Sequence, residues 1–168
     1  PPGTNARIPI VAVTGTNGKT TTTRLIAHMA KMKGHSVGYT TSDGVYIQNM
    51  MVLKGDCTGP ASAEYVLRDP SVDFAVLETA RGGLLRAGLA FDHCDIGIVT
   101  NVAADHLGLK GIHTLEQLAK AKGVIPESVH PSGYAILNAD DELVYGMRKD
   151  LKCNVAFFSM NENNKHIK

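Results

Sequence analysis

The chain has 168 residues, of which 43% are hydrophobic and 20% are charged, and its formal net charge is +1. This length and composition predict one soluble globular domain over residues 1–168 with a buried core, and they exclude a largely disordered protein. The near-neutral charge argues against nucleic acid as a partner, and no apolar run approaches the roughly 18 residues of a bilayer span, so we expect no membrane partner.

Three cysteines, Cys57, Cys94 and Cys153, occur without a C-x-x-C motif. An odd number of cysteines fits a reducing compartment better than a disulfide framework, and no secretory leader pattern is present. We therefore expect a cytoplasmic protein. The chain starts at Pro1 without an initiator Met and ends on a polar tail at residues 161–168, as a fragment of a longer polypeptide would.

Short apolar runs alternate with amphipathic segments along the chain. The apolar runs predict strands at residues 8–14, 37–41, 74–77, 96–100, 134–137 and 155–158, and a small hairpin at 45–47 and 51–53. Helical spacing and capping signals predict helices at 20–33, 60–68 and 114–123, with Pro126 beyond the last of these, and a short helix after residue 141 to about 149. This alternation predicts a doubly wound, mostly parallel α/β sheet with helices on both faces.

The most informative stretch follows the first predicted strand and reads Gly15-Thr16-Asn17-Gly18-Lys19-Thr20-Thr21. It is a shortened form of the phosphate-binding loop G-x-x-x-x-G-K-[ST], because Val13 stands where the first glycine would be. Backbone N–H groups of such a loop, followed by a helix N-terminus, favour bound phosphate. We expect Lys19 to reach the β- and γ-phosphates and Thr20 to bind Mg²⁺. The alternative is a plain glycine-rich turn with a surface lysine.

Polar clusters follow most of the predicted strands. Because the carboxyl ends of parallel strands meet at one edge of a sheet, we expect these clusters to lie together, where open α/β sheets bind their ligands. They comprise residues 14–20, 41–44, 78–83, 101–106 and 138–141.

Glu78 directly follows a buried strand and, with Thr20, offers the hydroxyl and carboxylate oxygens that Mg²⁺ prefers. The alternative for Glu78 is a solvated carboxylate at a strand end. Asp105 and His106 offer a second ion site or a hydrogen-bonding pair at the next strand end, although a lone histidine is more often structural.

Three further cations are candidates for the site. Arg81 and Arg86 flank two glycines, where guanidinium groups suit a carboxylate or a phosphate, or they are solvated arginines on a short helix. Lys122 looks from the sequence alone like a solvated helix lysine.

The sequence resembles the central ATP-binding domain in the Mur ligase-like half of the cyanophycin synthetases. The motifs that carry this resemblance are Glu78-Thr79-Ala80-Arg81-Gly82-Gly83-Leu84-Leu85-Arg86, Gly55-Asp56-Cys57-Thr58-Gly59-Pro60 and Asn101-Val102-Ala103-Ala104-Asp105-His106-Leu107-Gly108. The loop at residues 15–22 and Asn138-Ala139-Asp140-Asp141 are similar to the wider superfamily of Mur ligases and folylpolyglutamate synthases. The similarity runs from about residue 8 to 161.

The resemblance implies that ATP phosphorylates a carboxylate and that an amine attacks the acyl phosphate. The implied substrates are arginine and the aspartate side chains of a poly-aspartate backbone. It also implies that Lys19 stabilises the transferring phosphoryl group, that Thr20 and Glu78 hold one Mg²⁺, and that His106 holds a second. Lys122 falls where many Mur ligases carry a carbamylated lysine, so its role there depends on that modification.

Relatives add an N-terminal ATP-grasp half and a C-terminal domain, so the resemblance implies that this chain alone does not catalyse ligation. It also leads us to expect a homo-oligomer at full length. Two other functions remain open: a Mur or folate-type ligase that acts on a different carboxylate, and a nucleotide-binding module without chemistry.

Overall fold

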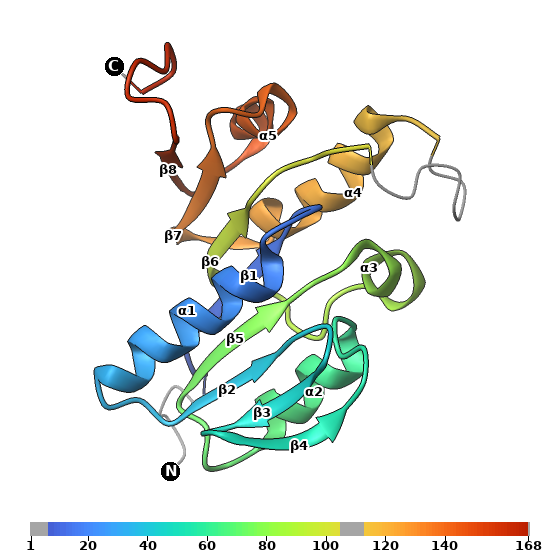
Figure 1. Cartoon of the computed structure of the whole chain (residues 1–168), viewed down its shortest axis with the longest axis vertical. Helices are drawn as coiled ribbons and strands as arrows, with labels where there is room; N and C mark the ends of the chain where they lie inside the picture. The colour runs from blue at the N-terminus through green and yellow to red at the C-terminus, as the bar shows by residue number, and fades with distance from the viewer. Residues whose placement is uncertain (1–6, 105–112, 168) are drawn as a thin grey trace.

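The computed structural model describes residues 7–104 and 113–167, apart from the side chains of Leu84 and Arg86. Over these residues the chain forms one eight-stranded sheet with helices on both faces (Figure 1). The strands are β1 (Ile10–Thr14), β2 (Val37–Thr40), β3 (Gly44–Ile47), β4 (Met50–Lys54), β5 (Phe74–Glu78), β6 (Cys94–Val99), β7 (Val129–Asn138) and β8 (Asn154–Phe158). The helices are α1 (Lys19–Met32), α2 (Pro60–Arg68), α3 (Arg81–Ala87), α4 (Leu115–Glu127), α5 (Glu142–Gly146) and the 3₁₀ helix η1 (Met147–Asp150).

The strand order is β4-β3-β2-β5-β1-β6-β7-β8. In this order every neighbouring pair from β2 to β8 is parallel, and the two antiparallel pairs are β2–β3 and β3–β4. This confirms the predicted doubly wound, mostly parallel α/β fold, including the small hairpin. Most predicted strand and helix ends agree with the structure to within two residues.

The two faces of β1 explain why helices cover both sides of the sheet. Ile10 and Ala12 pack in a core cluster with α2 and the end of α4, whereas Val11 and Val13 pack with Ala27 of α1. Side chains alternate between the faces of a strand, so a continuous apolar run must be covered on both faces. β1 is accordingly buried along its whole length at the centre of the sheet.

The helix predicted to end at Gly123 continues to Glu127, so its predicted end was wrong. Its start is as expected, because the Thr114 hydroxyl accepts a hydrogen bond from the Gln117 N–H at 3.2 Å in a capping box. The last turn of α4 packs tightly on β6: a Cβ added at Gly97 would lie 3.4 Å from Cα of Pro126. This packing outweighs the low helix propensity of glycine and proline.

The strand predicted at residues 134–137 is also longer, because β7 begins at Val129. Its pairing with β6 shifts between Cys94–Val129 and Ile96–Tyr134, so residues 130–133 form a bulge. Gly133 permits this bulge, since a Cβ there would lie 2.3 Å from the backbone oxygen of Asp95. In the described residues, no helix has both the length and the apolar character needed to cross a membrane.

Candidate active site

The loop between β1 and α1 requires glycine at two positions. Gly15 has φ 147°, and a Cβ there would lie 1.8 Å from Oγ1 of Thr100. Gly18 has φ 83° and precedes α1 as its N-cap residue. Residues with side chains rarely adopt these backbone angles, so the two glycines allow the loop to turn tightly against the segment after β6.

That segment fixes the loop through several hydrogen bonds. The Thr16 N–H donates to the Asn101 carbonyl at 2.9 Å, and the Asn17 N–H donates to Oδ1 of Asn101 at 2.9 Å. The Thr100 hydroxyl donates to the Asn17 carbonyl at 2.6 Å. Two of the predicted polar clusters therefore lie side by side, and the loop is held in place before any ligand binds.

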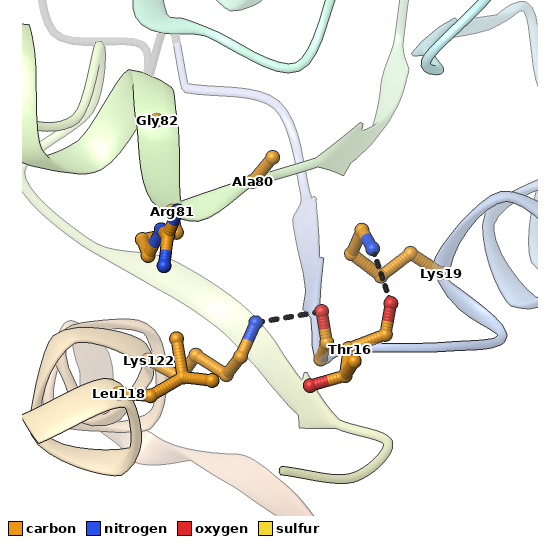
Figure 2. Close-up of a pocket in the computed structure, with 8 residues that line it drawn as sticks. Thr16, Lys19, Ala80, Arg81, Gly82, Leu118 and Lys122 are labelled. Atoms are coloured by element: carbon orange, nitrogen blue, oxygen red, sulfur yellow. Dashed lines mark hydrogen bonds between the residues drawn. The ribbon is translucent and has the colours of Figure 1, made fainter. Parts of the chain in front are cut away.

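Lys19 is the first residue of α1, and its Nζ donates to the Thr16 carbonyl at 2.9 Å. Figure 2 shows this ammonium folded back over the loop. A cation at the positive end of a helix is well placed for an anion that binds to the loop. Thr21 lies next to Thr20 in the first turn of α1.

Glu78 is only 2% exposed, and its buried carboxylate accepts two hydrogen bonds from other elements. The Thr20 hydroxyl donates to Oε2 at 2.8 Å, and the Ser42 N–H donates to the same oxygen at 3.2 Å. The hydroxyl oxygens of Thr20 and Ser42 are 3.2 Å apart. The end of β5, the first turn of α1 and the loop after β2 therefore meet at one point.

The donor set at this point suits Mg²⁺. Among the described residues, no group of three or more His, Cys, Asp or Glu side chains is arranged to hold a metal ion. Mg²⁺ bound with a nucleotide needs fewer protein ligands, because it takes one or two carboxylates or hydroxyls together with phosphate oxygens and water. The Thr20 hydroxyl and the Glu78 carboxylate supply such oxygens. Asp105 and His106 lie outside the described residues.

Lys122 is not the solvated helix lysine that the sequence alone suggests. It is 4% exposed, and its Nζ donates to the Gly15 carbonyl at 2.7 Å (Figure 2). With Lys19 and Arg81 it lines a cavity of about 250 Å³ beside the loop. Three cationic side chains from α1, α3 and α4 thus surround one cavity, which suits an anionic ligand. The side chain of Arg86 lies outside what the structure describes.

The Asn138–Asp141 cluster joins the same edge of the sheet, although it contacts the segment after β6 rather than the loop itself. Nδ2 of Asn138 donates to the Thr100 carbonyl at 2.8 Å, and Oδ2 of Asp141 accepts from the Val102 N–H at 2.6 Å. Oδ1 of Asp141 also caps α5. The five clusters that the sequence placed at one edge are therefore linked there through their described residues.

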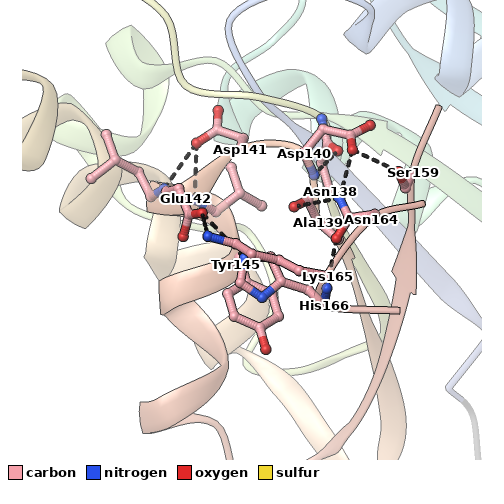
Figure 3. A network of polar contacts seen from close by, with 12 residues as sticks. Asn138, Ala139, Asp140, Asp141, Glu142, Tyr145, Ser159, Asn164, Lys165 and His166 are labelled. Atoms are coloured by element: carbon pink, nitrogen blue, oxygen red, sulfur yellow. Dashed lines mark hydrogen bonds and ion pairs between the residues drawn. The ribbon is translucent and has the colours of Figure 1, made fainter. Parts of the chain in front are cut away.

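Asp140 organises the chain after β8 (Figure 3). Its carboxylate accepts hydrogen bonds from the Ser159 hydroxyl at 2.6 Å, the Met160 N–H at 2.7 Å and the Asn164 amide at 2.7 Å. The Ser159 hydroxyl, followed by the two other donors, lowers the pKa of Asp140. Hydrogen bonds to a carboxylate favour its ionised form, so Asp140 is a stable anchor for the final segment.

A second contact in Figure 3 fixes the same segment to α5. The His166 ring stacks on Tyr145 with centroids 3.6 Å apart, and Nζ of Lys165 lies 2.8 Å from Oε1 of Glu142. Hydrogen bonds from Lys165 and His166 lower the pKa of Glu142. These residues were not predicted as a group, because nothing in the sequence links residues 142–145 to 165–166.

A mostly parallel α/β sheet, with a glycine-rich loop and a lysine between its central strand and the following helix, defines a P-loop type domain. A family model described as the Mur ligase middle domain matches residues 13–168, and the chain belongs to this family.

Five curated relatives of the chain carry one name, cyanophycin synthetase. The chain is 65% identical over 167 residues to a cyanophycin synthetase from Synechocystis sp., covering 99% of this chain and 19% of that protein. It is 62% identical over 167 residues to a cyanophycin synthetase from Crocosphaera subtropica, with the same coverage of both proteins. The chain thus spans 19% of the length of these relatives.

The chain is also similar to two Mur ligases and, in fold, to a further solved structure. A UDP-N-acetylmuramoylalanine–D-glutamate ligase from Desulfitobacterium hafniense is 35% identical over 150 residues, covering 89% of this chain and 29% of that protein. A solved UDP-N-acetylmuramoyl-L-alanyl-D-glutamate–2,6-diaminopimelate ligase superposes with a TM-score of 0.76 at 30% identity. The match covers 93% of this chain and 33% of that one. A folylpolyglutamate synthase/dihydrofolate synthase with Mn, AMPPNP and L-glutamate bound superposes with a TM-score of 0.65 at 21% identity. The match covers 92% of this chain and 44% of that one, and it shows a shared fold.

Proposed function

We propose that this chain is the ATP-binding domain of an ATP-dependent carboxylate–amine ligase that joins arginine to aspartate side chains of a poly-aspartate backbone. The observation that carries the proposal is the Thr20–Glu78 hydrogen bond at 2.8 Å. It places a buried carboxylate from β5 beside the first turn after the P-loop. The 65% identity to a cyanophycin synthetase supports the choice of substrates.

The proposed roles of Lys19, Thr20 and Glu78 follow from their positions, and that of His106 rests on the family resemblance alone. ATP would lie along residues 15–21, with Lys19 neutralising charge on the transferring phosphoryl group. Thr20 and Glu78 would hold one Mg²⁺, and His106 would hold a second. Bound Mg²⁺ supplies charge neutralisation to the phosphate oxygens and orients them.

The cavity lined by Lys19, Arg81 and Lys122 is our candidate for the place where the acceptor carboxylate meets the phosphoryl group. A guanidinium binds a carboxylate with two parallel hydrogen bonds, so Arg81, with Arg86 as a further candidate, suits the aspartate side chain. A carbamate on Lys122 would add a negative charge beside a metal ion. Mass spectrometry of the intact protein tests whether Lys122 is modified.

We expect ligation to need more than this chain. An ATP-grasp half would extend the poly-aspartate backbone, and a C-terminal domain would close over the nucleotide. We also expect the full-length polypeptide to form a homo-oligomer. The chain's 19% share of its relatives' length supports this view of a multidomain enzyme.

ADP release by the complete polypeptide tests the proposal. The experiment compares arginine alone, a poly-aspartate primer alone, both together, and a muropeptide or folate with its own amino acid. Stimulation only by arginine and primer together supports the proposed reaction. Stimulation by a muropeptide or folate would assign the chain to another ligase of the superfamily, and no stimulation would indicate a nucleotide-binding module.

A further inference from the structure

Asp43, in the loop between β2 and β3, uses both of its carboxylate oxygens. Oδ2 accepts from a guanidinium nitrogen of Arg24 at 2.6 Å and from the Tyr46 hydroxyl at 2.6 Å. Oδ1 accepts from the Thr41 hydroxyl at 2.6 Å. The Thr41 and Tyr46 hydrogen bonds lower the pKa of Asp43. The side chain of Asp43 is partly exposed, so burial of its charge does not by itself require these hydrogen bonds.

The three donors come from α1, from β3 and, for Thr41, from the same loop as Asp43. Arg24 lies four residues after Thr20, on the same face of α1. Tyr46 lies on β3, where its ring stacks on Tyr39 of β2 with centroids 4.7 Å apart and an interplanar angle of 3°. Asp43 therefore connects α1 to the hairpin across the loop that follows β2.

Ser42, the neighbour of Asp43, contacts the candidate metal site directly. Its N–H donates to Oε2 of Glu78 at 3.2 Å, and its hydroxyl lies 3.2 Å from that of Thr20. Two adjacent loop residues thus meet two residues of α1, one turn apart: Ser42 meets Thr20, and Asp43 meets Arg24. A loop held at both points cannot shift relative to the Glu78 carboxylate without breaking these contacts.

We propose that Asp43 is a positioning residue that, through Arg24 and Tyr46, holds the loop after β2 against Glu78 and so preorganises the metal ligands Thr20 and Glu78. This inference rests on the proposed function, because it takes Thr20 and Glu78 to hold the metal ion. Hydrogen-bond partners behind metal ligands commonly change metal affinity by about 10- to 100-fold when they are removed.

The test measures Mn²⁺ affinity of the complete polypeptide at saturating ADP, by electron paramagnetic resonance, for wild type and Asp43→Asn. The asparagine keeps the shape of the side chain but presents an amide nitrogen to its donors. We expect the Mn²⁺ dissociation constant to rise about tenfold, while ADP affinity in EDTA and the melting temperature change little. A merely structural role would weaken Mn²⁺ binding and ADP binding and lower the melting temperature together.

Asp69→Asn is the matched control. Asp69 also accepts two hydrogen bonds, from the N–H and hydroxyl of Ser71, but it follows α2 at the opposite end of the sheet from Glu78. This variant should keep wild-type Mn²⁺ affinity. Tyr46→Phe removes one donor to Asp43 and keeps the ring, so it should weaken Mn²⁺ binding in the same direction but less.

A double variant distinguishes a shared network from separate effects. Arg24→Ala combined with Asp43→Asn should weaken Mn²⁺ binding no more than the stronger single variant, because both break the same connection. Wild-type Mn²⁺ affinity in Asp43→Asn and Tyr46→Phe would overturn the inference. Failure of the wild-type protein to bind Mn²⁺ with ADP would instead overturn the proposed metal site.

Discussion

Replacing Gly15 with alanine tests whether the P-loop depends on its close contact with the segment after β6. The new Cβ would lie 1.8 Å from Oγ1 of Thr100 and 3.2 Å from the Asn101 backbone nitrogen, at a φ of 147°. The backbone strain costs about 1–3 kcal/mol, and overpacking adds about 1–3 kcal/mol. We therefore expect Gly15→Ala to lose about 2–6 kcal/mol of unfolding free energy in urea titrations.

Two variants separate strain from overlap. Gly18→Ala lies in the same loop at φ 83°, but nothing lies within 4 Å of its Cβ, so it should show the strain cost alone. Thr100→Ala in the Gly15→Ala background removes the nearest overlapping atom and should recover part of the lost stability. An equal loss in Gly15→Ala and Gly18→Ala would refute the contribution of the Thr100 contact.

Three other predictions concern single side chains. Lys122→Met leaves the Gly15 carbonyl without its donor and should cost about 1–3 kcal/mol of unfolding free energy, whereas the exposed Lys120→Met should change it little. Burial raises the pKa of the Cys94 thiol to about 11, so iodoacetamide at pH 8 should modify the partly exposed Cys153 first and Cys94 only after denaturation. The pKa of Asp140 is lowered in the folded state, so its contribution to stability is present above its unfolded pKa and is lost as the pH falls through the folded value. The melting temperature of Asp140→Asn should therefore fall less steeply than that of the wild type below about pH 4.

The sequence predicted the fold well where local signals and packing agree. The capping box at Thr114, the proline that opens α2 at Pro60 and the apolar run of β1 each correspond to a boundary in the structure. Glycine and proline were misleading in α4, because contacts with Gly97 keep its last turn helical. Local propensity contains no information about such contacts.

The candidate site was predictable as a set of loops but not as a set of contacts. Parallel strands bring their carboxyl ends together, so Glu78 and Thr20 could be expected near each other. The burial of Lys122 could not, because it depends on how α4 approaches the P-loop rather than on the helix sequence around it. The Asp43–Arg24 contact was missed for the same reason, since it joins residues of two elements that lie 19 positions apart in the sequence.

Turnover by the complete polypeptide after Lys19→Ala substitution is the most direct test of the ligase assignment. The loss of one preorganised cation should lower ADP release with arginine and a poly-aspartate primer by about 10²–10³-fold, at an unchanged melting temperature. The exposed Lys33→Ala, beyond the other end of α1, should retain wild-type turnover. Near-normal ADP release by folded Lys19→Ala protein would contradict the catalytic role of the loop.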